Sequence, residues 1–113
     1  MLTSVESKSA LIRDANDAFR RSFVGGAVLI SAGVEALPSD FRKTLMQSVR
    51  EFEAFNADND PHGEHDFGEI RFDEDTFLFK IEYYDRDMAT HSPDPADAAV
   101  TTRVLHILRV EEY

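Results

Sequence analysis

The sequence contains no cysteine. This absence excludes a disulfide framework, a thiol nucleophile and every cysteine-based zinc site. Glycine is also scarce, and Gly25, Gly26 and Gly33 match neither spacing of the glycine-rich loops that bind phosphate. The Gly-x-Ser-x-Gly turn of a serine hydrolase is missing as well. No enzyme class that depends on these motifs is therefore indicated.

Long apolar runs are lacking too. The longest mostly apolar stretch, residues 24–34, is interrupted by glycine and serine, and a bilayer requires roughly 20 apolar residues. The first residues do not combine a basic stretch with an apolar run, as a signal peptide would. We therefore expect a soluble, cytoplasmic protein that does not contact a membrane.

Positive charge is scarce in the second half of the chain. Residues 1–50 hold seven Lys/Arg against five Asp/Glu, whereas residues 51–113 hold five against seventeen. The second half thus carries −12 of a chain whose net charge is −10. We expect no direct contact with nucleic acid, because such binding depends on neutralising phosphates with Lys and Arg. Two interpretations stay open: a solvated acidic surface that keeps the protein soluble, or a surface that faces a basic protein partner.

Periodicity predicts the fold. The 113 residues have the length of a single domain, 1–113. The predicted elements are helices over about 7–22 and 38–55 and strands over 27–30, 67–73, 76–84 and 101–110. Residues 31–37 are expected to form a connection, and Asp73-Glu74-Asp75 a tight hairpin turn. The fold class is α+β: two amphipathic helices on one face of a largely antiparallel sheet of three to four strands, in the order α-β-α-β-β-β.

The same periodicity predicts which side chains are buried. The apolar stripe of the first helix consists of Leu11, Ala15, Ala18 and Phe19, and the arginines lie largely off it. The predicted core comprises Phe41, Leu45, Phe52, Phe77, Phe79 and Ile81. The last strand is apolar on both faces, which indicates an inner position in the sheet.

One segment, residues 58–68, invites a functional interpretation. Within it, His62, Glu64, His65 and Asp66 offer imidazole and carboxylate ligands that a divalent metal accepts without thiolates, and Glu64 is suited to act as a base toward a bound water. The two histidines are three residues apart with a glycine between them, so this is not the helical zinc-protease motif. The alternative is purely structural, because Asp and Asn are good turn and capping residues. We predict no cofactor, with a divalent metal at these four residues as the alternative.

A second candidate site lies at the end of the 76–84 strand. Alternation places Tyr83 on the face of Phe79 and Ile81, and Tyr84 on the opposite face with Lys80. Tyr84 and Asp85 are suited to bind a ligand, or else belong to a surface network of ion pairs. Lys80 either meets an acid of the 62–66 segment or extends along the outer face of the sheet.

These segments together carry a resemblance. The runs DNDPHGEHDFG (58–68), KIEYYD (80–85), DPAD (94–97) and VTTRVL (100–105) resemble a bacterial domain-of-unknown-function family, number 3768. The resemblance covers about residues 12–113. This family consists of short proteins common on plasmids and in accessory genomic regions of alphaproteobacteria. The resemblance implies a cytoplasmic location and an accessory role, and it brings no activity, cofactor or catalytic residue.

We therefore expect a small acidic accessory protein, more a binding protein than an enzyme, whose C-terminal half contacts a protein partner with a basic surface. Its most concrete form is an anti-defence or regulatory inhibitor of nucleic-acid-binding machinery. One alternative is a metal-dependent hydrolase or metal-binding domain that uses the 62–66 segment. The other is a homo-oligomer in which an edge strand is paired.

Overall fold

The computed structural model describes residues 4–72 and 74–113, and its elements follow the predicted fold class. In chain order they are α1 (Ser4–Ser22), β1 (Gly26–Ile30), α2 (Ala32–Glu35), α3 (Ser39–Glu51), β2 (Phe67–Phe72), β3 (Asp75–Tyr84), η1 (Ala98–Val100), β4 (Thr102–Arg109) and η2 (Val110–Glu112). The α+β class is confirmed. One-turn helix α2 stands where a plain connection was predicted, because the Ser31 hydroxyl caps it by accepting a hydrogen bond from the Val34 amide.

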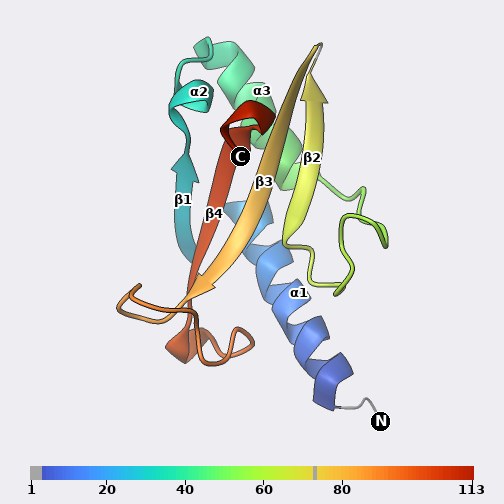
Figure 1. Cartoon of the computed structure of the whole chain (residues 1–113), viewed down its shortest axis with the longest axis vertical. Helices are drawn as coiled ribbons and strands as arrows, with labels where there is room; N and C mark the ends of the chain where they lie inside the picture. The colour runs from blue at the N-terminus through green and yellow to red at the C-terminus, as the bar shows by residue number, and fades with distance from the viewer. Residues whose placement is uncertain (1–3, 73) are drawn as a thin grey trace.

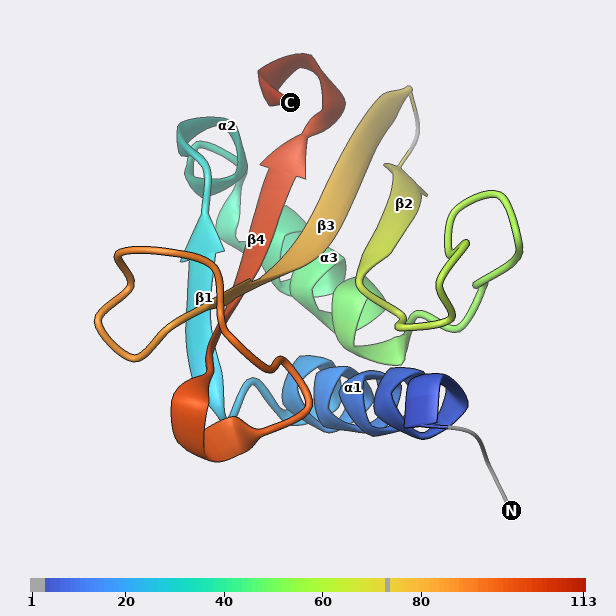
Figure 2. The same ribbon diagram turned by 60° about the horizontal axis from the view of Figure 1, so that its bottom comes forward.

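The four strands form one sheet in the order β1-β4-β3-β2. β2, β3 and β4 are antiparallel neighbours, whereas β1 pairs with β4 in parallel. The inner position predicted for the last strand is therefore confirmed. Figure 2 shows the long helices α1 and α3 on the same side of the sheet. β1 and β2 are the two edge strands, at opposite sides of the sheet (Figure 1).

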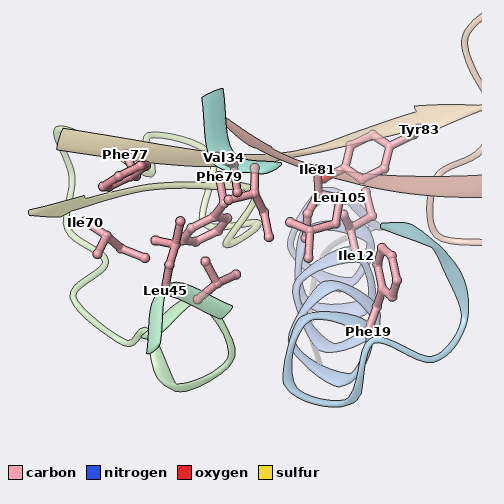
Figure 3. Packing of buried hydrophobic residues seen from close by; sticks show 12 residues of the cluster. Ile12, Phe19, Val34, Leu45, Ile70, Phe77, Phe79, Ile81, Tyr83 and Leu105 are labelled. Atoms are coloured by element: carbon pink, nitrogen blue, oxygen red, sulfur yellow. The ribbon is translucent and has the colours of Figure 1, made fainter. Parts of the chain in front are cut away.

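The core lies between this sheet and the helices, as the side chains in Figure 3 show. Leu45, Phe77, Phe79 and Ile81 are buried there, as predicted. Phe52 is partly buried and packs against the cluster. The prediction for Phe41 is wrong: its side chain is 39% exposed, because it lies at the periphery of the core, edge-on to Phe72 with ring centroids 5.4 Å apart.

The buried face of α1 differs from the predicted apolar stripe. Leu11 is 55% exposed and Ala18 is exposed, whereas Ile12, Asn16, Phe19 and Arg20 are buried. Two of these four side chains are polar. A prediction from apolar residues alone therefore assigns the wrong face of the helix to the core. The helix also begins earlier than predicted, at Ser4.

Helix α3 ends at Glu51, four residues before the predicted end at Phe55. Phe52 adopts an extended backbone with φ −62° and ψ 131°, and its ring then meets the Phe79 ring at 5.1 Å between centroids. β2 leaves room for these rings at Gly68, where an added Cβ would approach the Phe52 ring to 2.8 Å and the Phe79 ring still more closely. The early end of the helix thus places a third aromatic ring, that of Phe55, beside the loop that follows.

The strand boundaries agree with the predictions to within one residue. The predicted turn at 73–75 cannot be compared throughout, because Asp73 lies outside the described residues. Among residues 4–72 and 74–113, no helix is long and apolar enough to cross a membrane.

Candidate functional site

The loop before β2 is built by its own Asn and Asp side chains. Asn56 Oδ1 accepts a hydrogen bond from the Asn59 amide at 3.1 Å, and Asn59 Oδ1 accepts one from the Asn56 amide at 2.9 Å. Asp60, which is buried, accepts two from the amides of Glu64 and His65, at 2.9 and 3.1 Å. These contacts are the turn and capping bonds expected of the structural alternative, and they fix the direction of the side chains that follow.

His65 connects this loop to α1. Its backbone has φ 56°, a conformation that L-residues rarely adopt and that the Asp60 contacts hold in place. Its Nδ1 lies 2.9 Å from Asp17 Oδ1, and its Nε2 lies 3.7 Å from Asp60 Oδ2. The ring stacks on Phe55 with centroids 3.9 Å apart and an angle of 4° between planes. Both ring nitrogens therefore face carboxylates of the same chain.

Arg20 supplies the positive charge next to the contact between His65 and Asp17, and its side chain is fully buried. Its guanidinium donates to Asp17 Oδ1 at 3.0 Å and to the carbonyls of Val49 and Arg50 at 3.0 and 3.2 Å. Those carbonyls belong to the last turn of α3, beyond which the helix supplies no i+4 donor, and the Val49 carbonyl also accepts from the Phe52 amide at 3.3 Å. The guanidinium carbon also lies 5.3 Å from the centroid of the Phe55 ring. Burial lowers the pKa of Arg20, and the hydrogen bond to Asp17 opposes this shift.

A second buried network joins α1 to β3 and β4. Asn16 Nδ2 donates to the Tyr83 hydroxyl at 2.8 Å and to the Glu64 carbonyl at 3.0 Å, while its Oδ1 accepts from Arg103 Nε at 2.9 Å. The Tyr83 hydroxyl in turn donates to Glu64 Oε1 at 2.9 Å. Arg103 also donates to the Pro95 carbonyl. Burial is the main cause of the raised pKa of Tyr83, which keeps the phenol protonated.

Beside these networks lies an open cleft of about 300 Å³. Its lining residues are Asp66, Ile81, Glu82, Tyr83, Tyr84 and His91. The cleft follows the edge of β3 at residues 81–84, between the start of β2 and the segment that returns through His91. It thus brings the two segments singled out from the sequence to one place.

We call this hollow the Asp66 cleft. Its two carboxylates, Asp66 and Glu82, differ in whether a cation or a hydroxyl offsets their negative charge. Glu82 pairs with Lys80 at 3.1 Å and accepts a hydrogen bond from the Tyr84 hydroxyl at 2.6 Å, and that hydroxyl is the main cause of its lowered pKa. The pKa of Asp66 is raised, first by burial and then by the nearby negative charge of Glu64. Among the described side chains, no Lys, Arg or His lies within ion-pair distance of Asp66.

The remaining predicted site residues are spread around the cleft. His62 is exposed, and Lys80 lies on the outer face of the sheet, where it meets Glu82 and not an acid of the 62–66 segment. Asp85 accepts hydrogen bonds from the Ala89 amide and the Thr90 hydroxyl, and the latter is the main cause of its lowered pKa. Within the described part of the chain, no three His, Asp or Glu side chains are arranged to hold a metal ion.

The sequence did not predict the partners that these side chains contact in the two buried networks, namely Asn16, Asp17, Arg20 and Arg103. A usable signal existed in α1, where Ile12, Asn16 and Phe19 follow the spacing of one helix face. A polar residue on such a face is a candidate for a buried hydrogen bond. Arg103 offered no comparable signal beyond its place in a strand of apolar residues.

The family described as "Protein of unknown function (DUF3768)" matches residues 30–112, which include α3, the loop before β2 and the Asp66 cleft. No curated protein and no solved structure matches the chain.

Proposed function

The chain belongs to the DUF3768 family, and from the geometry of its acidic cleft we propose that it is a non-catalytic accessory protein that binds a basic surface of a partner protein. The observation that carries this proposal is Asp66, a carboxylate that is partly buried in the cleft and has no cationic partner among the described residues. A buried charge without a partner is costly, and a Lys or Arg side chain entering from outside removes that cost.

The walls of the cleft suit such a side chain. Tyr84 and His91 contribute rings on which a guanidinium can stack, and Glu82 adds a second carboxylate. Arg is therefore the residue we expect at the centre of the partner's surface. The groups best suited to chemistry, by contrast, are held by the protein itself: the ring of His65 by Asp17 and Phe55, and the hydroxyl of Tyr83 by Asn16 and Glu64. This supports binding rather than catalysis.

The most specific form of the proposal is an inhibitor of nucleic-acid-binding machinery in the bacterial cytoplasm. Proteins that bind nucleic acid carry exposed Lys and Arg at their binding sites. A cleft with an uncompensated carboxylate, in a half-chain of net charge −12, complements such a site. Occupation of the site by this protein would then exclude the nucleic acid.

The test is capture of partners from the native host by the wild-type protein and by Asp66→Asn, followed by mass spectrometry. Glu35→Gln is the matched control, because it removes one negative charge from an exposed position on α2. We expect Asp66→Asn to lose a partner of basic surface that wild type and Glu35→Gln retain, and the purified partner to release its nucleic acid when the wild-type protein is added. Equal recovery of the same proteins by all three forms would refute the assignment of the cleft.

A further inference from the structure

A groove of opposite charge lies elsewhere on the molecule, between edge strand β1 and helix α3. It measures about 440 Å³, and its lining includes Ile30, Arg42, Lys43, Met46 and Arg50. Met46 lies four residues after Arg42 and three after Lys43, and Arg50 lies four after Met46, so these side chains share one face of α3. Ile30 and Met46 contribute apolar surface, and the other three contribute positive charge. We call this the basic groove.

The three cations of the basic groove belong to the minority of described Lys and Arg side chains that pair with no carboxylate. Twelve Lys and Arg residues face twenty-two acids, yet none of these three lies within 4 Å of a carboxylate among the described residues. Local charge in the groove is therefore opposite in sign to the net charge of −10. Such an arrangement favours an acidic ligand over further cations.

Two of the cations are fixed in place by backbone carbonyls. Arg42 Nη1 donates to the carbonyls of Glu35 and Leu37 at 2.9 and 3.2 Å. Arg50 Nε donates to the carbonyl of Arg21 at 2.8 Å. Carbonyls orient a guanidinium without cancelling its charge, so both groups are preorganised and remain positive.

The strand beside the groove has a free edge. β1 is hydrogen-bonded to β4 on one side only, and within the described residues no other backbone segment bonds to residues 26–30 on the other side. An open edge of this kind accepts an additional strand through main-chain hydrogen bonds. Alternate side chains of the added strand would point toward the helix side of the sheet, where Ile30 and α3 form the groove.

We propose that the basic groove and the β1 edge together bind an extended acidic peptide segment of a partner protein, which adds as a strand to β1. The charge of the groove selects Asp or Glu at the alternate positions that face α3, and the side chains between them point to the opposite face of the sheet. The five residues of β1 limit the segment to about five residues. This surface is distinct from the Asp66 cleft and goes beyond the function proposed above.

The experiment uses the full chain and a set of fluorescein-labelled peptides in which Glu and Val alternate, with binding measured by fluorescence anisotropy. Each peptide has a matched form with Gln in place of Glu, and two forms N-methylated at alternate backbone nitrogens. We expect the Gln form to bind at least tenfold more weakly, and one of the two N-methylated forms to lose binding. Equal affinity for the Glu and Gln forms, or no binding by any peptide of the set, would overturn the proposal.

Two protein variants locate the site. Lys43→Glu reverses one charge of the groove, and Arg71→Glu makes the same change at an exposed position on β2, at the opposite edge of the sheet. Lys43→Glu should weaken the Glu peptide at least tenfold, and Arg71→Glu no more than twofold. Equal effects of the two variants would overturn the assignment.

Two other occupants would give distinct results. If a single-stranded oligonucleotide binds more tightly than the Glu peptide and loses affinity in Lys43→Glu, the ligand of the groove is a nucleic-acid phosphate backbone and not a peptide. Concentration-dependent self-association in sedimentation, abolished by Lys43→Glu, would identify the occupant as a second copy of the chain. Either result overturns the peptide proposal.

Discussion

Replacement of Arg20 tests the contact on which the site depends. In Arg20→Ala the Arg50 carbonyl loses its donor, the Val49 carbonyl keeps only the Phe52 amide, and Asp17 loses its buried cation. Removing one partner of a buried ion pair costs about 3–5 kcal/mol, because the other charge stays buried without compensation. A domain of this size has a free energy of unfolding of about 5–15 kcal/mol, so the loss is a large fraction of the total.

The neighbouring residue provides the control. Arg21 pairs with Glu53 at 3.4 Å, and both side chains are more than half exposed. Because exposed pairs contribute about 0–1 kcal/mol, Arg21→Ala should change the free energy of unfolding by no more than about 0.5 kcal/mol. The two variants remove the same chemical group from adjacent positions, so the difference between them reports burial and hydrogen bonding.

The assay is urea denaturation followed by circular dichroism, with the slope m compared to confirm that the same surface is exposed. Arg20→Lys keeps the measurement possible if Arg20→Ala does not fold. A lysine retains the charge, but it lacks the planar fork that reaches two carbonyls and a carboxylate together, so we expect a loss of about 1–3 kcal/mol. Arg20→Lys within 0.5 kcal/mol of wild type, or Arg20→Ala equal to Arg21→Ala, would refute the reasoning.

Three further predictions concern the loop, the cleft and the surface charge. His65→Ala should lower the free energy of unfolding by about 1 kcal/mol or more, and zinc or manganese should leave the melting temperature of wild type unchanged; a metal-dependent rise that disappears in both His62→Ala and His65→Ala would support the metal site instead. Because the folded-state pKa of Asp66 is raised above its unfolded value near 3.9, its ionisation destabilises the folded state as pH rises above about 4. Asp66→Asn should therefore be more stable than wild type at pH 7, with the difference vanishing near pH 3, and denaturation curves across this range that show a constant difference would contradict it. In a mobility-shift titration at physiological salt the isolated protein should not bind duplex DNA, and salt-sensitive micromolar binding would show that the net charge misleads.

The fold could be predicted because its long elements repeat apolar residues at regular intervals. Phe77, Phe79 and Ile81 alternate along β3, and Leu45 and Val49 recur along α3, so both elements and their buried faces follow from local sequence. The end of α3 could not, because the bonds from Arg20 to its last carbonyls come from another helix. Periodicity also counts only apolar residues, and for that reason it misplaced the buried face of α1.

Only part of the candidate site could be predicted from the sequence, because contacts between distant segments decide the rest. The composition of residues 58–68 shows that the segment is rich in polar and charged side chains. It does not show which residue each of these side chains contacts. His65 meets Asp17 at a separation of 48 residues, and Asn16 meets Tyr83 at a separation of 67. Contacts at such separations leave no periodic trace, so the choice between a metal site and a structural role depends on tertiary structure.

The net charge of the chain is a poor guide to the kind of partner that its surface binds. Arg20 and Arg103 are buried and serve the fold, and most exposed cations pair with carboxylates of the same chain. Three cations without a carboxylate partner, Arg42, Lys43 and Arg50, line the basic groove beside β1. Asp66, a partly buried carboxylate with no cation within ion-pair distance among the described residues, lies in the cleft beside β3. Charge that is already neutralised within the chain contributes little attraction to a partner, so the uncompensated groups decide recognition. A chain of net charge −10 can on this basis present one site for a basic protein and another, at the opposite side of the same sheet, for an acidic peptide.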